Sequence, residues 1–527
     1  MLDDLGDTHR SLCRLHMALM DRMGVKTGHF GDADQALSDL GWPRRLIFAW
    51  PRRAAPGILA HSMHESSQPW WKSLNSYHWF VFAMASLAWL FDCLDQQLFL
   101  IARGGAMKAL LPPGADPKLY GSYATSIFIA GWATGGLIFG AVGDRVGRAR
   151  TLTICVLIYS LCTGLSAFSH GWIDFGIYRF LTGLGVGGVF GLAVALIADA
   201  LPEQARTGAL GWLQALSAVG NVTAGLIGLG LGNLEGKAFA AGSAWKYMFL
   251  IGAIPAFLCV FIQVRLKEPE KWVKAREEGR RTGAQFGSYA SLFGEARWRR
   301  PALFGMLLCI AGVIGLWGIG FFSPELVGDV IERSLREQGV AASEIAGKKT
   351  YWASVNMIVQ NIGAFFGMLA FTRFAQSHGR KVSFSIGFIA ALVATIGYFQ
   401  LFNSKGDIWM SAVMGFCQLS LFAGFAIYLP ELFPLRLRST GTSFCYNVGR
   451  FVAASGPLVQ GILQNRIAEA AVNKLGPGAT EAAKAAAKTG AFREACSWVS
   501  LIFLVGLVAL IFLPETRGQP LPEDRAD

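Results

Sequence analysis

The sequence predicts an all-α membrane protein in which twelve transmembrane helices form two pseudo-symmetric bundles of six. Of its 527 residues, 53% are hydrophobic and only 16% are charged, whereas an ordinary soluble protein carries about 25% charged residues. The mean hydropathy is +0.41. A dozen apolar stretches reach about 20 residues, the length that spans a bilayer, and motifs of the first half recur in the second.

The first 78 residues contain no apolar stretch of that length. We expect the extension over 1–78 to be cytoplasmic and disordered. Its start is polar and acidic, whereas the start of a signal peptide is basic. Residues 1–62 lack a sustained amphipathic pattern, and Met63 heads a more typical leader, so residues 1–62 are expected to be disordered or absent from the natural protein.

The apolar stretches fall into two groups of six. The first group is expected to cross the membrane at 79–102, 120–142, 151–169, 172–198, 208–231 and 245–265. The second group is expected to cross at 302–323, 351–372, 383–402, 408–430, 439–463 and 496–513. These groups define a bundle over 79–265, a cytoplasmic linker over 266–300, a second bundle over 301–513 and a cytoplasmic tail over 514–527.

Basic residues predict the orientation of the spans, because Lys and Arg are retained on the cytoplasmic side. The linker over 266–300 contains nine of them, whereas the loop at 169–171 contains none. The net charge of +12 therefore reflects membrane topology, and no nucleic-acid partner is expected. The prediction is a multi-pass protein of a bacterial inner membrane with both termini in the cytoplasm.

An internal repeat supports the two-bundle architecture. Gly147-Arg148 follows the second stretch, and Gly379-Arg380 follows the eighth, 232 residues later. The same offset relates an acid, a proline and an arginine at 199, 202 and 206 to those at 431, 434 and 438. One offset that serves two separate motifs indicates a duplicated six-span unit, as in transporters built from two similar halves.

The run Gly136-Leu-Ile-Phe-Gly-Ala-Val-Gly-Asp-Arg-Val-Gly-Arg148 resembles the loop 2–3 signature of the major facilitator superfamily. Within it, Asp92-Cys-Leu-Asp95 resembles the Asp-x-x-Asp motif of the aromatic-acid and sialate-type metabolite:proton symporters, although Cys93 stands where the aromatic-acid group usually has glycine. This resemblance implies proton-coupled symport of a small organic anion by alternating access. Carriage of a neutral metabolite or sugar remains the alternative, and a non-transporting nutrient sensor is a further one.

The resemblance also implies a gate on the cytoplasmic face. Glycines at near four-residue spacing clear one face of span two for a neighbouring helix. Asp144 is then expected to face the positive N-terminus of span eleven, and an arginine of the loop to reach Asp199. Gln376 replaces the aspartate in the second half, so the gating contacts of the two halves should differ in strength. The predicted gating residues are Gly136, Gly140, Asp144, Arg145, Gly147, Arg148, Asp199, Arg206, Glu431 and Arg438.

Two carboxylates near the middle of span one are the candidates for proton coupling. Asp92 and Asp95 are spaced i, i+3 and therefore share one helix face. Two carboxylates so close in a low dielectric do not both ionise readily, so one of them can carry a proton. The family motif adds Arg179 of span four to this set. The alternative is that each aspartate pairs with an arginine and locks helices together.

Arg450, near the middle of span eleven, is the candidate for binding an anionic substrate. Its planar guanidinium matches a carboxylate bidentately. Tyr446 and Asn447 share its helix face, and Gln96 of span one completes the predicted substrate-binding set. The alternative is an internal salt bridge from Arg450 to the aspartates of span one.

No enzyme is expected, because no GxSxG, HExxH or Walker A motif occurs. The nine cysteines form no CxxC pair, and they are interpreted as small apolar packing residues rather than metal ligands or disulfides. The expected partners are a small-molecule substrate and the lipid bilayer. The chain is predicted to be a monomer without a cofactor, using the proton as its coupling ion.

Overall fold

The computed structural model describes residues 69–235, 238–240, 242–254, 265–453, 456–476 and 480–523. The expectations for residues 1–62, and that of disorder as far as residue 68, lie outside these residues, whereas residues 70–73 and 76–78 are helical. In the described part, regular secondary structure is helical apart from one isolated bridge between Glu235 and Phe239.

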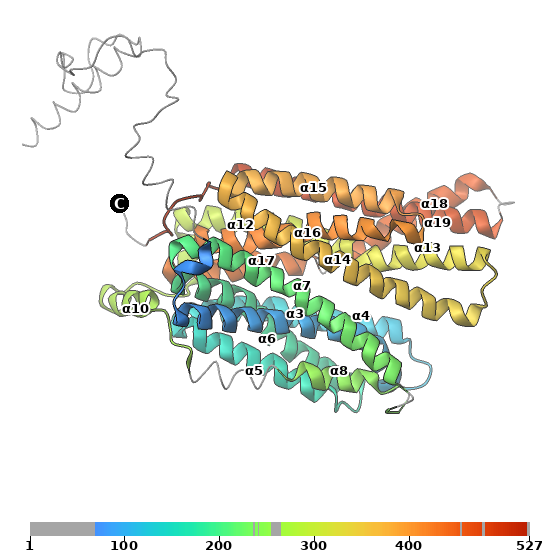
Figure 1. The fold of residues 1–527 in the computed structure, drawn as a ribbon, viewed down its shortest axis with the longest axis horizontal. Coiled ribbons are helices and arrows are strands. Elements are labelled where there is room, and N and C mark those ends of the chain that lie inside the picture. Colours follow the sequence, from blue (N-terminus) through green and yellow to red (C-terminus); the bar gives the residue numbers. More distant parts are fainter. Residues whose placement is uncertain are drawn as a thin grey trace, which may run out of the picture. The chain divides into compact units, whose positions relative to one another are not determined.

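The first bundle follows the predicted order of spans (Figure 1). Its helices are α3 (Ser76–Leu110), α4 (Pro117–Val146), α5 (Arg148–Ser166), α6 (Trp172–Ala200), α7 (Glu203–Leu234) and α8 (Ala244–Gly252). α3 begins where the side chain of Asn75 accepts a hydrogen bond from the backbone N–H of His78 at 2.8 Å, an arrangement that satisfies a free donor of the first turn.

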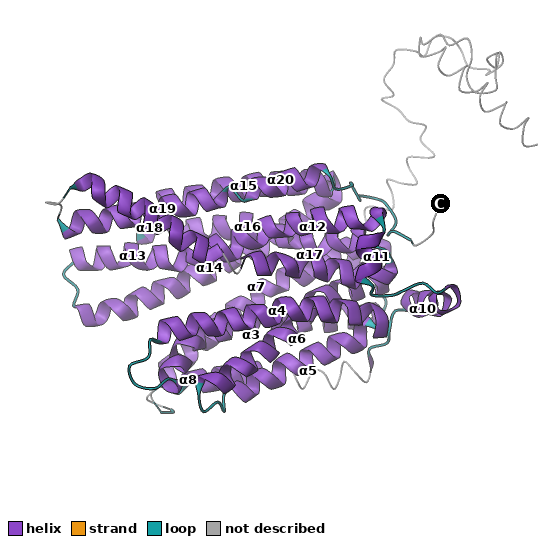
Figure 2. Ribbon diagram, turned by 180° about the vertical axis from the view of Figure 1, so that it is seen from behind, coloured by secondary structure: helices purple, strands orange, loops and turns teal. Residues whose placement is uncertain are grey.

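The second bundle is built from more segments than the first. Its helices are α12 (Ala296–Ile314), α13 (Ser323–Glu337), α14 (Ala342–His378), α15 (Arg380–Leu401), α16 (Trp409–Tyr428), α17 (Arg438–Ala453), α18 (Gly456–Leu475), α19 (Glu481–Ser500) and α20 (Phe503–Ile511). A short π-helix over Gly315–Ile319 and a 3-10 turn over Gly320–Phe322 interrupt span seven between α12 and α13. The two bundles lie side by side (Figures 1 and 2).

Glycine sets the sharp turn at the same place in both bundles. Gly147 separates α4 from α5 with φ of +132°, and Gly379 separates α14 from α15 with φ of +95°. Residues with a Cβ rarely adopt this region of backbone space. The repeated Gly-Arg motif therefore corresponds to a repeated helix–turn–helix geometry.

Within the described residues, nine helical segments are long and apolar enough to cross a membrane. The other three predicted spans are 245–265, 302–323 and 439–463. The first of these is described only as far as residue 254. Of the other two, α12 begins with Arg297, Arg299 and Arg300, which lower its hydropathy without stopping the helix. The helix α17 is described over only 16 residues, fewer than a membrane span needs.

Two segments expected as loops are helical. The region 464–495 was expected to be a loop that connects spans eleven and twelve outside the membrane, but α18 and α19 occupy most of it. That expectation was wrong because the segment is rich in alanine and lysine, which favour helix without being apolar. The linker over 266–300 likewise contains α10 (Glu270–Thr282) and α11 (Tyr289–Gly294).

The two ends of the helical bundles differ. At one end α13 packs against α14 and α18 packs against α19, and we call it the hairpin end. At the other end lie Asp144, Arg148, Asp199, Glu431 and Arg438, and we call it the ion-pair end. α10 lies at the ion-pair end (Figure 1).

Candidate functional site

α4 makes its closest approaches through glycine. A Cβ at Gly136 would lie 2.1 Å from Nδ2 of Asn447, and one at Gly140 would lie 2.5 Å from Cβ of Ser443. Both neighbours belong to α17 of the other bundle. On another face of α4, a Cβ at Gly135 would lie 1.9 Å from the backbone oxygen of Leu184, within the first bundle. The glycines thus allow α4 to touch both α6 and α17.

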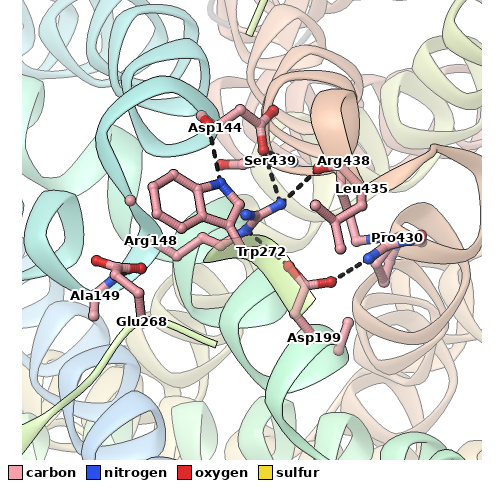
Figure 3. Close-up of polar contacts among 12 residues, drawn as sticks. Asp144, Arg148, Ala149, Asp199, Glu268, Trp272, Pro430, Leu435, Arg438 and Ser439 are labelled. Atoms are coloured by element: carbon pink, nitrogen blue, oxygen red, sulfur yellow. Dashed lines mark hydrogen bonds and ion pairs between the residues drawn. The ribbon is translucent and has the colours of Figure 1, made fainter. Parts of the chain in front are cut away.

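Asp144 in the last turn of α4 caps the first turn of α17 (Figure 3). Its Oδ2 accepts hydrogen bonds from the backbone N–H of Thr440 at 2.8 Å and from the Thr440 hydroxyl at 2.7 Å. Its Oδ1 accepts the backbone N–H of Ser439 at 3.2 Å. Asp144 is fully buried, and its negative charge lies at the partially positive end of α17.

Arg148 joins this carboxylate to a second one. Its Nη2 lies 3.1 Å from Oδ1 of Asp144, and its Nε lies 2.8 Å from Oδ2 of Asp199 at the end of α6. The same Nη2 donates to the backbone oxygen of Leu435 at 2.6 Å. Both side chains of the Arg148–Asp199 pair are buried, so removal of either one would leave the other buried charge with one ion-pair partner fewer.

Arg438 of the second bundle forms an ion pair with the other oxygen of Asp199 (Figure 3). Its Nε also donates to the backbone oxygen of Pro430 at 3.2 Å. The result is an alternating chain of charges, Asp144–Arg148–Asp199–Arg438, that crosses from one bundle to the other.

The second bundle contains the corresponding pair. Arg380 binds Glu431 bidentately, with Nη2 to Oε1 at 2.7 Å and Nε to Oε2 at 3.0 Å. Arg206 of the first bundle interacts electrostatically with both Glu431 and Arg438, and its Nε donates to the backbone oxygen of Ala198 at 3.0 Å. Each bundle thus places an arginine near the acid of the other.

The sequence did not predict two glutamates that cap helices at this end. Glu268 accepts the backbone N–H groups of Ala149 and Arg150 at 3.2 and 3.0 Å, at the start of α5. Glu515 accepts those of Arg380 and Lys381 at 2.9 Å, at the start of α15. A signal was available, because Glu268 precedes a proline and Glu515 follows one just beyond the last span of each half.

The hydrogen bonds to Glu515 also affect its ionisation. Burial alone would raise the pKa of this carboxyl, but backbone N–H donors from Arg380, Lys381, Arg517 and Thr516 outweigh it and hold the pKa below the usual value.

Trp272 of α10 is a further contact that the sequence did not predict. Its Nε1 donates to the backbone oxygen of Asp144 at 3.0 Å, and the guanidinium of Arg148 lies 5.8 Å from its ring centroid. Arg145 faces the linker instead, since its Nε and Nη2 donate to the backbone oxygens of Phe286 and Gly287 at 3.2 and 3.0 Å. The linker therefore packs directly on the ion-pair end.

Asp95 and Arg179 form one of two charged groups in the interior of the bundles. Arg179 is fully buried, and its Nη2 donates to Ser166 Oγ at 2.6 Å and to Thr163 Oγ1 at 3.3 Å. Its guanidinium also lies 4.7 Å from the ring centroid of Phe249. Asp95 is fully buried and interacts electrostatically with Arg179.

Asp92 belongs to the other interior group. It is fully buried, and its Oδ2 accepts a hydrogen bond from Gln96 Nε2 at 2.8 Å. It interacts electrostatically with Arg450. Among the described residues, no carboxylate lies within 4 Å of Arg450 as an ion-pair partner, so the internal salt bridge considered from the sequence is not formed here.

Arg450 is held by aromatic rings. Its guanidinium carbon lies 3.7 Å from the ring centroid of Trp132 and 4.2 Å from that of Tyr446. Nη1 donates to Oδ1 of Asn447 at 3.3 Å, and Nε has no hydrogen-bond partner. Tyr446 in turn stacks on Phe190 of α6, with centroids 3.8 Å apart. The sequence did not single out Trp132, because an aromatic residue within an apolar span resembles ordinary packing.

The interior therefore offers a buried cation with an unused donor, beside a carboxylate and an amide. Such an arrangement can bind an anion and hold a proton. Among the described residues, no group of three or more His, Cys, Asp or Glu side chains could hold a metal ion.

The profile of the Major Facilitator Superfamily matches residues 94–457. The chain belongs to the Major Facilitator Superfamily. It is thus a multi-pass membrane transporter, not an enzyme, and its twelve-span, two-bundle architecture is the fold of this superfamily.

Two relatives and one solved structure illustrate this membership. The chain is 25% identical over 451 residues to a probable 4-methylmuconolactone transporter of Cupriavidus pinatubonensis, covering 85% of this chain and 93% of that protein. It is 27% identical over 394 residues to the cis,cis-muconate transport protein of Acinetobacter baylyi, covering 74% and 89%. The fold is similar to that of the proton:xylose symporter XylE, with a TM-score of 0.66 at 17% identity, covering 85% and 98%.

Proposed function

We propose that this superfamily member is a proton-coupled symporter that carries a small organic anion by alternating access. The observation that carries the proposal is the environment of Arg450: a buried guanidinium between Trp132 and Tyr446, with a free Nε donor and no ion-pair partner within 4 Å among the described residues. A buried cation without a carboxylate in direct contact is costly. A substrate carboxylate would compensate the charge with a bidentate pair.

The relatives agree with an organic acid as substrate. Muconate is a dicarboxylate and 4-methylmuconolactone carries one carboxylate beside a lactone ring, so both relatives are named for organic acids. In the proposed site, Arg450 binds the carboxylate, and Asn447, Tyr446 and Gln96 surround it. The rings of Trp132 and Tyr446 offer flat apolar surfaces for an unsaturated carbon chain.

The proton site of the proposal comprises Asp95, Asp92 and Arg179. Asp95 and Arg179 form a buried pair of opposite charges with Thr163 between them, which accepts a hydrogen bond from Arg179 and interacts with Asp95. Protonation of Asp95 would weaken its attraction to Arg179 and allow the helices that carry them to move. Asp92, hydrogen-bonded to Gln96 and near Arg450, would link the proton to the substrate site.

The ion-pair end is proposed as the cytoplasmic gate, which the chain Asp144–Arg148–Asp199–Arg438 would hold closed. The linker packs on this end of the bundles. It contains nine basic residues, and basic residues are retained on the cytoplasmic side. In the proposed orientation, both termini would lie in the cytoplasm of a bacterial cell, with the protein in the inner membrane.

Uptake into liposomes tests the proposal. The full-length protein is reconstituted with a pH-sensitive dye inside, and cis,cis-muconate, 4-methylmuconolactone or xylose is added outside with and without an inward proton gradient. Accumulation of an acid above equilibrium, with acidification of the lumen, is expected. Accumulation of xylose with no uptake of either acid would overturn the organic-anion assignment. Uptake that only equilibrates would overturn proton coupling.

A further inference from the structure

A groove of about 950 Å³ lies at the ion-pair end between α5 and α10. Its walls are the first three turns of α5 and the exposed side of α10, and we call it the α5–α10 groove. It is separate from the interior charges of the proposed transport site. Glu268 and Trp272, which contact the ion-pair network, form part of its lining.

The α5–α10 groove has a basic rim. Arg150, Lys267, Arg276 and Arg280 all line it, against the two acidic residues Glu268 and Glu277. The carboxylate of Glu268 is already used to cap α5. In the part of the chain that the structure describes, Arg150, Lys267 and Arg280 have no acidic partner within 4 Å. The rim is therefore suited to an anion.

The wall along α5 changes from basic to apolar. Ile154 and Leu157 follow Arg150 on the same helix face, and they are 44% and 41% exposed. At 1.5 Å per residue, Leu157 lies about 10 Å further along the axis than Arg150. Because α5 is one of the membrane-spanning helices, this change runs from the membrane surface toward the hydrocarbon. On the side of α10, Val273 adds a further exposed apolar side chain.

We infer that the α5–α10 groove binds an acidic phospholipid of the leaflet at the ion-pair end. The phosphate headgroup contacts Arg150, Lys267 and Arg280 at the rim. An acyl chain lies along Ile154 and Leu157. A soluble anion would use the rim but would leave the apolar wall exposed, whereas a phospholipid matches both parts.

The same lipid would stabilise the closed ion-pair end. Arg276 lies 5.0 Å from the ring centroid of Trp272, and Trp272 is hydrogen-bonded to the backbone of Asp144. A headgroup that bridges α5 and α10 would keep Trp272 in this position. The lipid is thus expected to bias the transporter toward the conformation described here.

The N-terminal segment is a poorer occupant on grounds of charge. Residues 1–68 contain eight acidic and eight basic side chains. The segment therefore has no net negative charge that would complement the basic rim of the groove. An acidic phospholipid carries its negative charge in one headgroup.

Lipid retention tests the inference without any substrate, so its outcome is independent of the proposed function. The full-length protein is placed in phosphatidylcholine nanodiscs with and without phosphatidylglycerol, and bound lipids are counted by native mass spectrometry. The variant Arg150→Gln/Arg280→Gln leaves the Arg276–Trp272 contact in place. It should bind phosphatidylglycerol about 30-fold more weakly, which corresponds to about 1 kcal/mol for each basic side chain.

Two matched variants serve as controls. Arg299→Gln/Arg300→Gln removes the same charge from exposed positions outside the groove and should retain the lipid. Arg150→Lys/Arg280→Lys keeps the charge and should also retain it. Equal loss in the Arg299/Arg300 variant would show a general charge effect and overturn the site. Displacement of the lipid by millimolar inorganic phosphate alone would assign the rim to a free anion instead.

A second readout follows the ion-pair end. Hydrogen exchange of the peptide over 436–444 should slow when phosphatidylglycerol is added to the parent protein, and it should not respond in Arg150→Gln/Arg280→Gln. A response of equal size in both proteins would overturn the link between the lipid and the closed conformation.

Discussion

Asp144 of the first bundle accepts the backbone N–H of Thr440 in the second bundle at 2.8 Å, although 296 residues separate them. A carboxylate at the end of one helix is thereby the cap of another. The contact combines a hydrogen bond with the attraction between a charge and a helix terminus. It also depends on Gly136 and Gly140, which have no side chain and let α4 approach α17 closely.

The Asp144→Asn change should loosen the ion-pair end. Asparagine keeps the shape but loses the charge, and the interaction of a charge with a helix terminus is worth about 0.3–1 kcal/mol, or up to about 2 when partly buried. Hydrogen exchange of the peptide over 436–444 should therefore speed up by about 2- to 30-fold. Gln376→Ala, at the equivalent position of the other bundle, should have little effect. An unchanged rate in Asp144→Asn would contradict the proposed gating role.

Two glycines of α4 should respond differently to alanine. Gly135→Ala pushes against the backbone of Leu184 inside one bundle, and overpacking of this kind costs about 1–3 kcal/mol, so the thermal midpoint should fall. Gly140→Ala pushes against Ser443 between the bundles, and opening of the ion-pair end relieves the clash. Its midpoint should change less, while exchange over 436–444 rises.

Gly230→Ala is the control for this pair. A Cβ at that exposed position of α7 meets nothing within 4 Å. Alanine favours helix over glycine by about 1 kcal/mol, so the midpoint should stay or rise. Equal destabilisation in all three variants would show that local space does not decide the effect.

Asp95→Asn should separate proton coupling from substrate exchange. Asparagine resembles a protonated aspartate but cannot release a proton, so uphill uptake driven by a pH gradient should be lost while exchange without a gradient survives. Asp92→Asn shows which carboxylate is essential. Full pH-driven accumulation in both variants would show that neither aspartate carries the coupling proton, and joint loss of folded yield and exchange would favour a structural pairing with arginine.

Arg450→Lys should weaken substrate binding more than it weakens folding. An ammonium group cannot reproduce the bidentate fork of the guanidinium, and it also loses the planar contact with Trp132. Binding of cis,cis-muconate, measured by calorimetry in detergent, should fall by at least about tenfold, or about 1.4 kcal/mol. Unchanged affinity, with a normal thermal midpoint, would remove Arg450 from the substrate site.

Glu515→Gln should make the stability of the protein less dependent on pH. The folded protein holds the pKa of Glu515 below its usual value, so this carboxylate contributes stability above the unfolded pKa of about 4.3. That contribution is lost as the pH falls through the lower folded pKa. The midpoint difference between parent and variant should thus be largest near neutrality and vanish in acid. Glu523→Gln, at an exposed position, is the matched control for the loss of one carboxylate.

The sequence was sufficient to predict the two halves of the fold. The positions of the spans follow from the length of the apolar stretches. The 232-residue offset relates Arg148 to Arg380 and Asp199 to Glu431. Hydropathy was a poor guide wherever a helix is not apolar, as in α19, because alanine and lysine form helix without membrane character.

The site was predictable only in part. The arginines and aspartates stand out because a charge in an apolar span is unusual. Trp132 and Trp272 do not stand out, since their roles depend on neighbours 318 and 128 residues away, Arg450 and Asp144. Contacts of this kind are set by tertiary packing, which residue type and spacing do not encode directly.

The exchange of arginines between the bundles has a consequence for the origin of the chain. Arg438 reaches from the second bundle to Asp199 of the first, and Arg206 acts from the first on Glu431 of the second. In an isologous interface between identical subunits, residue i contacts j while j contacts i. The single chain therefore retains the contact pattern of a homodimer of six-helix subunits, joined end to end by the 266–300 segment.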